Sequence, residues 1–271
     1  MPLSKIQSEV LHLLAVHRDP ESYVAGSTPL NLNSPRFSSD IDVFHDKSER
    51  AFKAAEEDTA LLQKHGYDVK WVRQELSIHT AFISRGGDAT KLEWVVDSDF
   101  RFFPTISDET FGYLLHPVDL ATNKVAAAYG RQEPRDIVDL ITAHDRILPL
   151  GATIWGSAGK ALGLTPEGIV NEIRRTSRYT EKDFRKVESE PPIDPAATMI
   201  RLRALLEEAE AFVLRMPTDK VGLLFLEGTK VVQPDPDHLD KYQTHAGQRL
   251  GHWPSSPEIS AAMFEKALSR F

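Results

Sequence analysis

The stretch Ser38-Ser39-Asp40-Ile41-Asp42-Val43-Phe44 alternates polar and apolar residues, as a half-buried strand does. Residues i and i+2 of a strand project from the same face, so Asp40 and Asp42 present two carboxylates to one point, about 7 Å apart. Ile41 and Val43 then point into the core. Two close carboxylates repel, so ionising both favours a compensating cation. Such a pair also occurs at solvated strand edges without any bound cation. The surrounding sequence has to decide between a cation site and a solvated edge.

Gly26-Ser27 follows the short apolar segment 22–25, and twelve residues separate Ser27 from Asp40. Glycine permits close backbone approach, and a following turn offers free N–H groups to a phosphate. Ser27 adds a hydroxyl donor. Hard divalent cations, Mg²⁺ or alternatively Mn²⁺, take oxygen ligands and bind phosphate oxygens as well. The two motifs together predict a polyphosphate cradle beside a metal-binding carboxylate pair, which is what nucleotide chemistry requires.

A third acidic position is expected on the segment 91–97, which has the pattern of a strand. Glu93 lies within it, and Lys91 is on the same face. Asp97 is the competing residue, but it falls at the strand end, where solvated acids are common. We therefore prefer Glu93.

Composition narrows the class of protein. The 271 residues include no cysteine, which excludes disulfides, thiol nucleophiles and Cys-ligated metal sites. The net charge of −8 argues against a protein that coats DNA or other nucleic acid non-specifically. No apolar run has the length of about 18 residues that a membrane span needs. The first residues predict an amphipathic helix rather than a secretory signal, so a cytoplasmic protein without membrane association is expected.

The element pattern predicts an α+β fold with a small mixed sheet in residues 1–150 and a mostly helical domain in residues 151–271. Strands are expected near 22–25, 40–44, 67–73, 78–84 and 90–96, and helices near 3–17, 48–65, 117–129 and 134–147. In the second domain, helices are expected from Thr165-Pro166 and from Asp194-Pro195. Residues 221–232 predict a hairpin that turns at Glu227-Gly228. Residues 233–257 are expected to be irregular surface.

These motifs resemble the nucleotidyltransferase superfamily of DNA polymerase β, in which Gly-[Gly/Ser] precedes Asp-x-[Asp/Glu] by about ten residues. The chain is most similar to the AbiEii/AbiGii group of nucleotidyltransferase-like toxins. Four segments carry that similarity: Gly26–Leu32, Arg36–Asp42, Asp119-Leu120-Ala121-Thr122-Asn123-Lys124 and Arg135-Asp136-Ile137-Val138-Asp139-Leu140. Order and spacing agree over residues 20–145, and beyond about residue 160 no resemblance is recognised. Pro29 departs from the usual helix former, and Glu93 replaces the more frequent Asp.

The resemblance implies roles for the site residues. Asp40 and Asp42 hold the metal, and Glu93 ligates a second metal or acts as base. Gly26 and Ser27 anchor the terminal phosphates. The remaining positions are the catalytic residues Lys124 and Asp136 and the nucleotide-binding residues Lys91 and Asp139. Without the resemblance, Lys124 would be a plain surface lysine, and the dipole of the following helix alone would explain Asp136.

The implied function is transfer of NMP from an NTP to an acceptor hydroxyl by a toxin of a toxin–antitoxin or phage-defence pair. The resemblance suggests a tRNA end as acceptor and a cognate antitoxin as partner. The basic cluster between Arg174 and Lys186 is the candidate contact for tRNA backbone, or else a solvated helix face interleaved with Glu172, Glu181 and Asp183. Two alternatives remain: a small-molecule (aminoglycoside-type) nucleotidyltransferase, and a nucleotide-binding or protein-binding module of the same fold without turnover.

Overall fold

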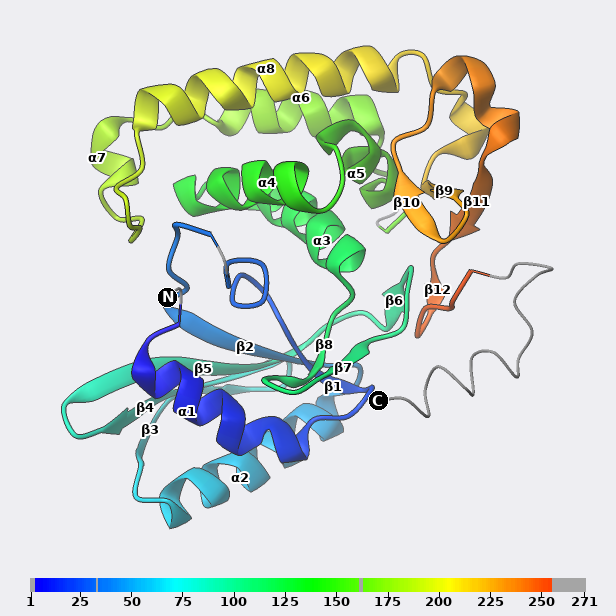
Figure 1. The fold of residues 1–271 in the computed structure, drawn as a ribbon. Coiled ribbons are helices and arrows are strands. Elements are labelled where there is room, and N and C mark those ends of the chain that lie inside the picture. Colours follow the sequence, from blue (N-terminus) through cyan, green and yellow to red (C-terminus); the bar gives the residue numbers. More distant parts are fainter. Residues whose placement is uncertain (1–2, 33, 161–162, 255–271) are drawn as a thin grey trace.

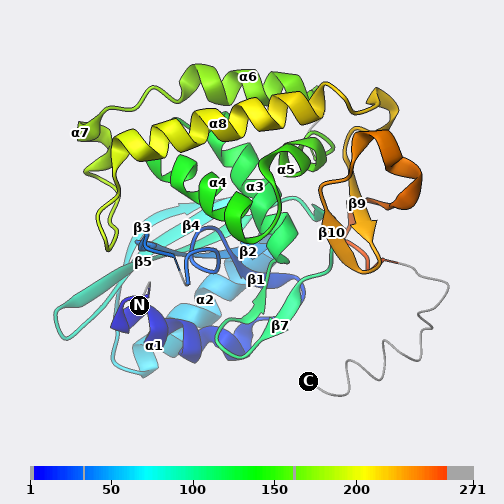
Figure 2. The same ribbon diagram turned by 45° about the horizontal axis from the view of Figure 1, so that its top comes forward.

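The computed structural model describes residues 3–32, 34–160 and 163–254. Figures 1 and 2 show a sheet with two helices on one face and a layer of helices on the other, with a small group of strands at one end of that layer. This is the expected α+β architecture. Residues 255–257 of the segment expected to be irregular, like the rest of 255–271, lie outside the described residues.

The main sheet is mixed. Its seven strands run in the order β3-β4-β5-β2-β1-β8-β7. The β2/β5 and β1/β8 pairs are parallel and the other pairs are antiparallel. The strands are β1 (Ser22–Ala25), β2 (Asp40–His45), β3 (Asp68–Glu75), β4 (Ile78–Arg85), β5 (Asp88–Val96), β7 (Ile106–Asp108) and β8 (Gly112–Leu114). The five strands expected from sequence are therefore present, and Gly86-Gly87 forms the turn between β4 and β5.

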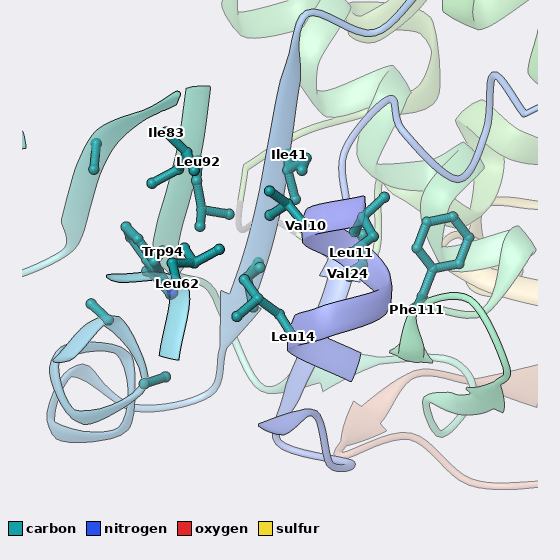
Figure 3. Packing of buried hydrophobic residues seen from close by; sticks show 14 of the residues in the cluster. Val10, Leu11, Leu14, Val24, Ile41, Leu62, Ile83, Leu92, Trp94 and Phe111 are labelled. Atoms are coloured by element: carbon teal, nitrogen blue, oxygen red, sulfur yellow. The ribbon is translucent and has the colours of Figure 1, made fainter. Parts of the chain in front are cut away.

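Helices α1 (Lys5–Leu14) and α2 (Ser48–Lys64) cover one face of the sheet, and a 3₁₀ turn (Ala15–His17) follows α1. Ser4 and Gln7 form a capping box that begins α1. The apolar side chains of both helices pack against the inner face of the strands. Figure 3 shows Ile41 of β2 and Leu92 of β5, both fully buried, in this core. The alternation of β2 therefore leaves Asp40 and Asp42 on the opposite face of the sheet.

The opposite face is covered by helices that share a second core. They are α3 (Pro117–Gly130), α4 (Pro134–Arg146), α5 (Leu150–Ser157), α6 (Pro166–Thr176), α7 (Glu181–Phe184) and α8 (Pro195–Val213). Proline stands at the start of α3, α4, α6 and α8, where its missing N–H costs no intrahelical bond. Val125, Ile137, Ile154, Ile169 and Leu205 meet in one cluster. The division of the chain at residue 150 stays a prediction.

The expected hairpin is confirmed as β9 (Leu223–Glu227) and β10 (Lys230–Val232), with Gly228 at positive φ. Two 3₁₀ turns (Thr218–Lys220 and Pro236–Lys241) flank it. The expectation of irregular surface after residue 233 is wrong in part, because β11 (Gln243–Ala246) pairs with β9 and β12 (Gln248–Arg249) pairs with β6 (Phe100–Arg101). His245 is buried and its Nε2 donates to the Phe102 carbonyl at 2.8 Å. These partners are distant in sequence, so local composition gives no sign of them.

No helix in the described residues is long and apolar enough to cross a membrane.

A buried charge cluster joins α2 to the sheet. Asp58 of α2 is fully buried and accepts two bonds from Arg18 Nη2, at 2.6 and 2.5 Å. It also accepts the indole N–H of Trp94 at 2.8 Å and lies 2.8 Å from His17 Nδ1. Burial alone would raise the pKa of Asp58. The contacts with Arg18, His17 and Trp94 lower it by more, so the pKa lies below its ordinary value. Asp58 thus stays ionised inside the core.

We expect Asp58→Asn to lower the free energy of unfolding by about 3–5 kcal/mol at neutral pH, because Arg18 is left buried without a counter-charge. Glu56→Gln, at an exposed position of the same helix, is the control and should cost less than about 0.5 kcal/mol. Because the folded pKa is depressed, the difference between wild type and variant is full at neutral pH and shrinks as the pH falls below about 4. Urea unfolding at pH 7 and pH 3 measures both effects. Equal costs for the two substitutions would contradict the prediction.

Candidate active site

The polar face of the sheet and the helices over it enclose a pocket of about 520 Å³. Its walls come from the turn after β1, from β2 and β5, and from α3 and α4, which lie over this face in both views (Figures 1 and 2). All nine residues expected at the site line it: Gly26, Ser27, Asp40, Asp42, Lys91, Glu93, Lys124, Asp136 and Asp139. The fold therefore brings together residues separated by more than a hundred positions in the sequence.

Gly26 is packed directly against Asp42. Its φ is +71°, and a Cβ built there would lie 2.0 Å from Asp42 Oδ2. Only glycine combines this left-handed conformation with such a close approach. Ala25 and Asp42 are register partners between β1 and β2, so the pairing of the two strands brings the turn against the carboxylate. Beyond Gly26 the chain forms turns through residue 32.

The register between β2 and β5 places a second acidic residue and a lysine beside the pair. Asp42 is the partner of Glu93, and Asp40 is the partner of Lys91. Lys91 Nζ lies 3.0 Å from Asp40 Oδ2 and 3.3 Å from Glu93 Oε1. Glu93 Oε1 also accepts the hydroxyl of Thr80, from β4, at 3.1 Å. Thr80 was not expected at the site, although the Gly86-Gly87 turn sets the register of the β4–β5 hairpin and so places Thr80 opposite Glu93.

The competing residue Asp97 follows the end of β5, and its backbone N–H donates to the His45 carbonyl at 3.0 Å. It lines the same pocket as Glu93. Glu93, however, is the acid that β5 sets directly beside Asp42. The geometry thus favours Glu93 as the third carboxylate of the cluster.

Asp42 is the carboxylate without a partner. Among the described residues, no hydrogen bond or ion pair reaches its side chain, while Asp40 and Glu93 both bind Lys91. Burial and the nearby charge of Glu93 raise the pKa of Asp42 to about 6, although Lys124 acts in the opposite direction. A nearby cation would therefore favour the ionised form of Asp42.

Lys124 of α3 enters the pocket from the helical side and is 6% exposed. Its Nζ lies 2.7 Å from Asp139 Oδ2, and Asp139 is fully buried. Arg36 holds the same carboxylate with two bonds, Nε at 2.8 Å and Nη2 at 3.1 Å, and Asn31 Nδ2 donates at 3.0 Å. Burial raises the pKa of Asp139, but Lys124 and Arg36 hold it below its ordinary value. Asp139 therefore fixes the lysine in place.

Arg36 and Asn31 were not expected to support the site, although both lie in segments that carry the family resemblance, Gly26–Leu32 and Arg36–Asp42. Their place in those segments was the sequence signal that could have found them. Their contacts join the loop before β2 to α4.

Asp136 lies one turn before Asp139 and has a different environment. Its Oδ1 accepts from the exposed Arg131 at 2.9 Å, and its Oδ2 is buried with no hydrogen-bond partner among the described residues. Burial raises the pKa of Asp136 above its ordinary value. Of the two acids in the Arg-Asp-x-x-Asp-Leu motif, Asp139 is the one that contacts Lys124.

The donor set suits a hard divalent cation. The described residues include no group of three or more His, Asp and Glu side chains arranged to hold a metal ion. Asp42 is nevertheless free of partners, and Asp40 engages Lys91 and Arg135 only through Oδ2, which leaves its Oδ1 available. Two adjacent carboxylates with unshared oxygens can bind Mg²⁺ or Mn²⁺ together with water and phosphate.

The fold matches a solved toxin structure. MenT4, a nucleotidyltransferase toxin from Mycobacterium tuberculosis H37Rv, superposes with a TM-score of 0.54 at 17% identity, over 79% of this chain and 84% of that one. The chain has a nucleotidyltransferase fold. A candidate nucleotidyltransferase from H. pylori gives a TM-score of 0.48 at 15% identity, over 79% of this chain and 98% of that one. No protein-family model and no curated protein sequence matches the chain. The resemblance to nucleotidyltransferase toxins is thus confirmed at the level of the fold.

The two acids of α4 should respond differently to neutralisation. Asp139→Asn leaves Lys124 and Arg36 buried without a counter-charge, and we expect a loss of about 3–5 kcal/mol in the free energy of unfolding. Asp136→Asn removes a charge that burial disfavours and that only an exposed arginine pairs, so its cost should stay below about 1 kcal/mol. Thermal and urea unfolding of the two variants measure the difference. A similar loss in both would refute the assigned contacts.

Proposed function

We propose that the protein is a nucleotidyltransferase that transfers NMP from an NTP to an acceptor hydroxyl and releases pyrophosphate. The observation that carries the proposal is one pocket that sets Gly26, Asp40, Asp42 and Glu93 of the sheet opposite Lys124 of α3. The nucleotidyltransferase fold supports the same conclusion.

The pocket is lined by both cations and acids. Its five cationic side chains are Lys91, Lys124, Arg131, Arg135 and Lys160, and its six carboxylates are Asp40, Asp42, Glu93, Asp97, Asp136 and Asp139. Gly26 and Ser27 form the turn against which the terminal phosphates would lie, as the close approach at Gly26 allows. Lys124, oriented by Asp139, offsets the negative charge of the phosphates during transfer.

In the proposed reaction, the acceptor oxygen forms a bond to the α-phosphorus while the bond from that phosphorus to the bridging oxygen breaks. Pyrophosphate leaves with the electron pair, and Glu93 takes the proton of the acceptor hydroxyl. Asp40 and Asp42 would hold Mg²⁺ or Mn²⁺, which when bound stabilises charge on the phosphate oxygens. The work of the protein is positioning and electrostatic stabilisation.

A transfer assay tests this function. We expect α-labelled NTP and Mg²⁺ to label total tRNA with the wild type and not with Asp42→Ala, and Lys124→Met to slow transfer by about 10²–10³-fold. Asp88→Ala, at the exposed start of β5, is the control and should retain full activity. All four NTPs are tried separately, which also identifies the nucleotide.

The outcomes separate the alternatives. Label that appears only on an added aminoglycoside or other small molecule would replace the tRNA acceptor by a small one. NTP binding without any product would favour a binding module. Transfer that survives Asp42→Ala would refute the proposed site.

We further propose that the acceptor is a tRNA end. A hollow of about 640 Å³ is lined by Arg175, Arg178, Tyr179 and Lys186 at the junction of α4, α6 and α7. A smaller hollow shares Lys186 with it and shares Arg135 with the nucleotide pocket. These shared residues form a basic path from the carboxylates to the surface, suited to a phosphodiester backbone.

Five of the six basic residues of the cluster fall into two groups, and the sixth, Lys182, lines neither hollow. Arg174, Arg175 and Arg185 form ion pairs with Glu210, Glu172 and Glu181, which is the behaviour of a solvated helix face. Arg178 and Lys186 have no ion pair among the described residues and line the hollows. They are therefore the residues of the cluster that we assign to RNA.

We expect the double variant Arg178→Glu/Lys186→Glu to weaken tRNA binding about tenfold or more and to reduce its salt dependence by about two charges. Arg185→Glu reverses a charge of the same cluster that lines neither hollow, and it should change binding little. Filter binding across a series of salt concentrations gives both quantities. An unchanged affinity for tRNA and an unchanged salt dependence in the double variant would contradict the proposal that Arg178 and Lys186 bind RNA.

The similarity to MenT4, a nucleotidyltransferase toxin, supports the proposal that transfer by this protein is toxic and that an antitoxin protein restrains it. We place its action in the cytoplasm, where tRNA and NTPs are available.

A further inference from the structure

Lys91 occupies the space between two of the three carboxylates. Its Nζ contacts Asp40 Oδ2 and Glu93 Oε1 at once, and its side chain is 29% exposed. The parallel register of β2 and β5 makes Lys91 the direct neighbour of Asp40, so strand pairing brings the two side chains within reach of each other. A cation of the chain itself thus bridges the two acids.

The position of Lys91 limits how many cations the cluster accepts. Asp40, Asp42 and Glu93 carry three negative charges when ionised, and Lys91 is the cation that contacts two of these acids at once. Arg135 contacts Asp40 from the side of α4, and Lys124 acts on Asp42. A second divalent ion between Asp40 and Glu93 would lie beside the ammonium group of Lys91, which like-charge repulsion opposes.

We propose that Lys91 takes the place of a second divalent cation, so that the carboxylate cluster binds one Mg²⁺ or Mn²⁺ ion through Asp40 and Asp42. This differs from the nucleotide contact expected for Lys91 from sequence, and it rests on the proposed function for the presence of a metal. Asp42, free of any partner in the described residues, is the acid left for the ion.

The oxygens of Asp42 and Oδ1 of Asp40 differ chemically from Oε1 of Glu93, which Lys91 contacts. Asp42 and Oδ1 of Asp40 offer oxygens with no competing donor, which suits a hard cation that keeps several waters. Glu93 is engaged by Lys91 and by the Thr80 hydroxyl, both on Oε1. Lys91 thereby holds Glu93 beside Asp42 and offsets the repulsion between the acids without a metal.

Counting bound Mn²⁺ tests the inference. Mn²⁺ alone is titrated into the full chain without nucleotide, and free Mn²⁺ is followed by electron paramagnetic resonance. The number of ions bound by the Asp40→Asn/Asp42→Asn double variant gives the binding elsewhere on the chain, and this number is subtracted from that of each other protein. We expect one ion in the wild type, two in Lys91→Met, and one in Lys91→Arg, which keeps the charge. The first ion should bind about tenfold more tightly in Lys91→Met.

Lys91→Gln serves as a second neutral variant if Lys91→Met does not fold, and thermal unfolding establishes that each variant is folded. Two ions in the wild type, or one in both neutral variants, would overturn the inference and leave the transfer reaction intact. No ion above the background in the wild type would count against both the inference and the metal-dependent function. The titration can therefore contradict the inference about Lys91 while the transfer assay still supports the proposed function.

Discussion

The two-residue period of β2 is the constraint on which the structure depends. Ile41 and Val43 are buried against α1 and α2, so Asp40 and Asp42 must face the other way. Because β2 is paired on both edges, with β1 and β5, neither carboxylate can turn inward without a register slip that would expose the apolar residues. The core thus keeps two repelling acids on one face, and the helical layer covers that face.

The helical layer is joined to the sheet by charge as well as by apolar packing. Asp139 of α4 is bound by Lys124 of α3 and by Arg36 from the loop before β2. Burying such a group is costly unless every partner is in place. The contacts that position Lys124 over the carboxylates therefore form only when the helical layer packs correctly on the sheet. A change at Asp139 is expected to alter both the geometry of the site and the stability of the fold.

Sequence patterns predicted the residues that act through local geometry. Alternation located Asp40 and Asp42, a glycine after an apolar strand located Gly26, and proline marked the start of α4. Glu93 followed from its strand. The contact of Lys91 with Glu93 also follows from the two-residue period of that strand, whereas the contacts of Lys91 with Asp40 and of Arg36 with Asp139 depend on strand order and helix docking. Strand order in turn depends on non-local pairing, which a local pattern does not encode.

The same reason explains the error after residue 233. Residues rich in Pro, Asp, His and Gly predict surface loops, yet His245 reaches back to the Phe102 carbonyl and β11 completes a sheet with β9. Phe102 and Phe103 in turn donate their N–H groups to Asp119 of α3, which Lys160 also contacts. The C-terminal strands are therefore linked through one buried carboxylate to the helix that carries Lys124. Residues far from the pocket in sequence therefore support its helical wall, while Asp40, Asp42 and Glu93 come from strands of the main sheet.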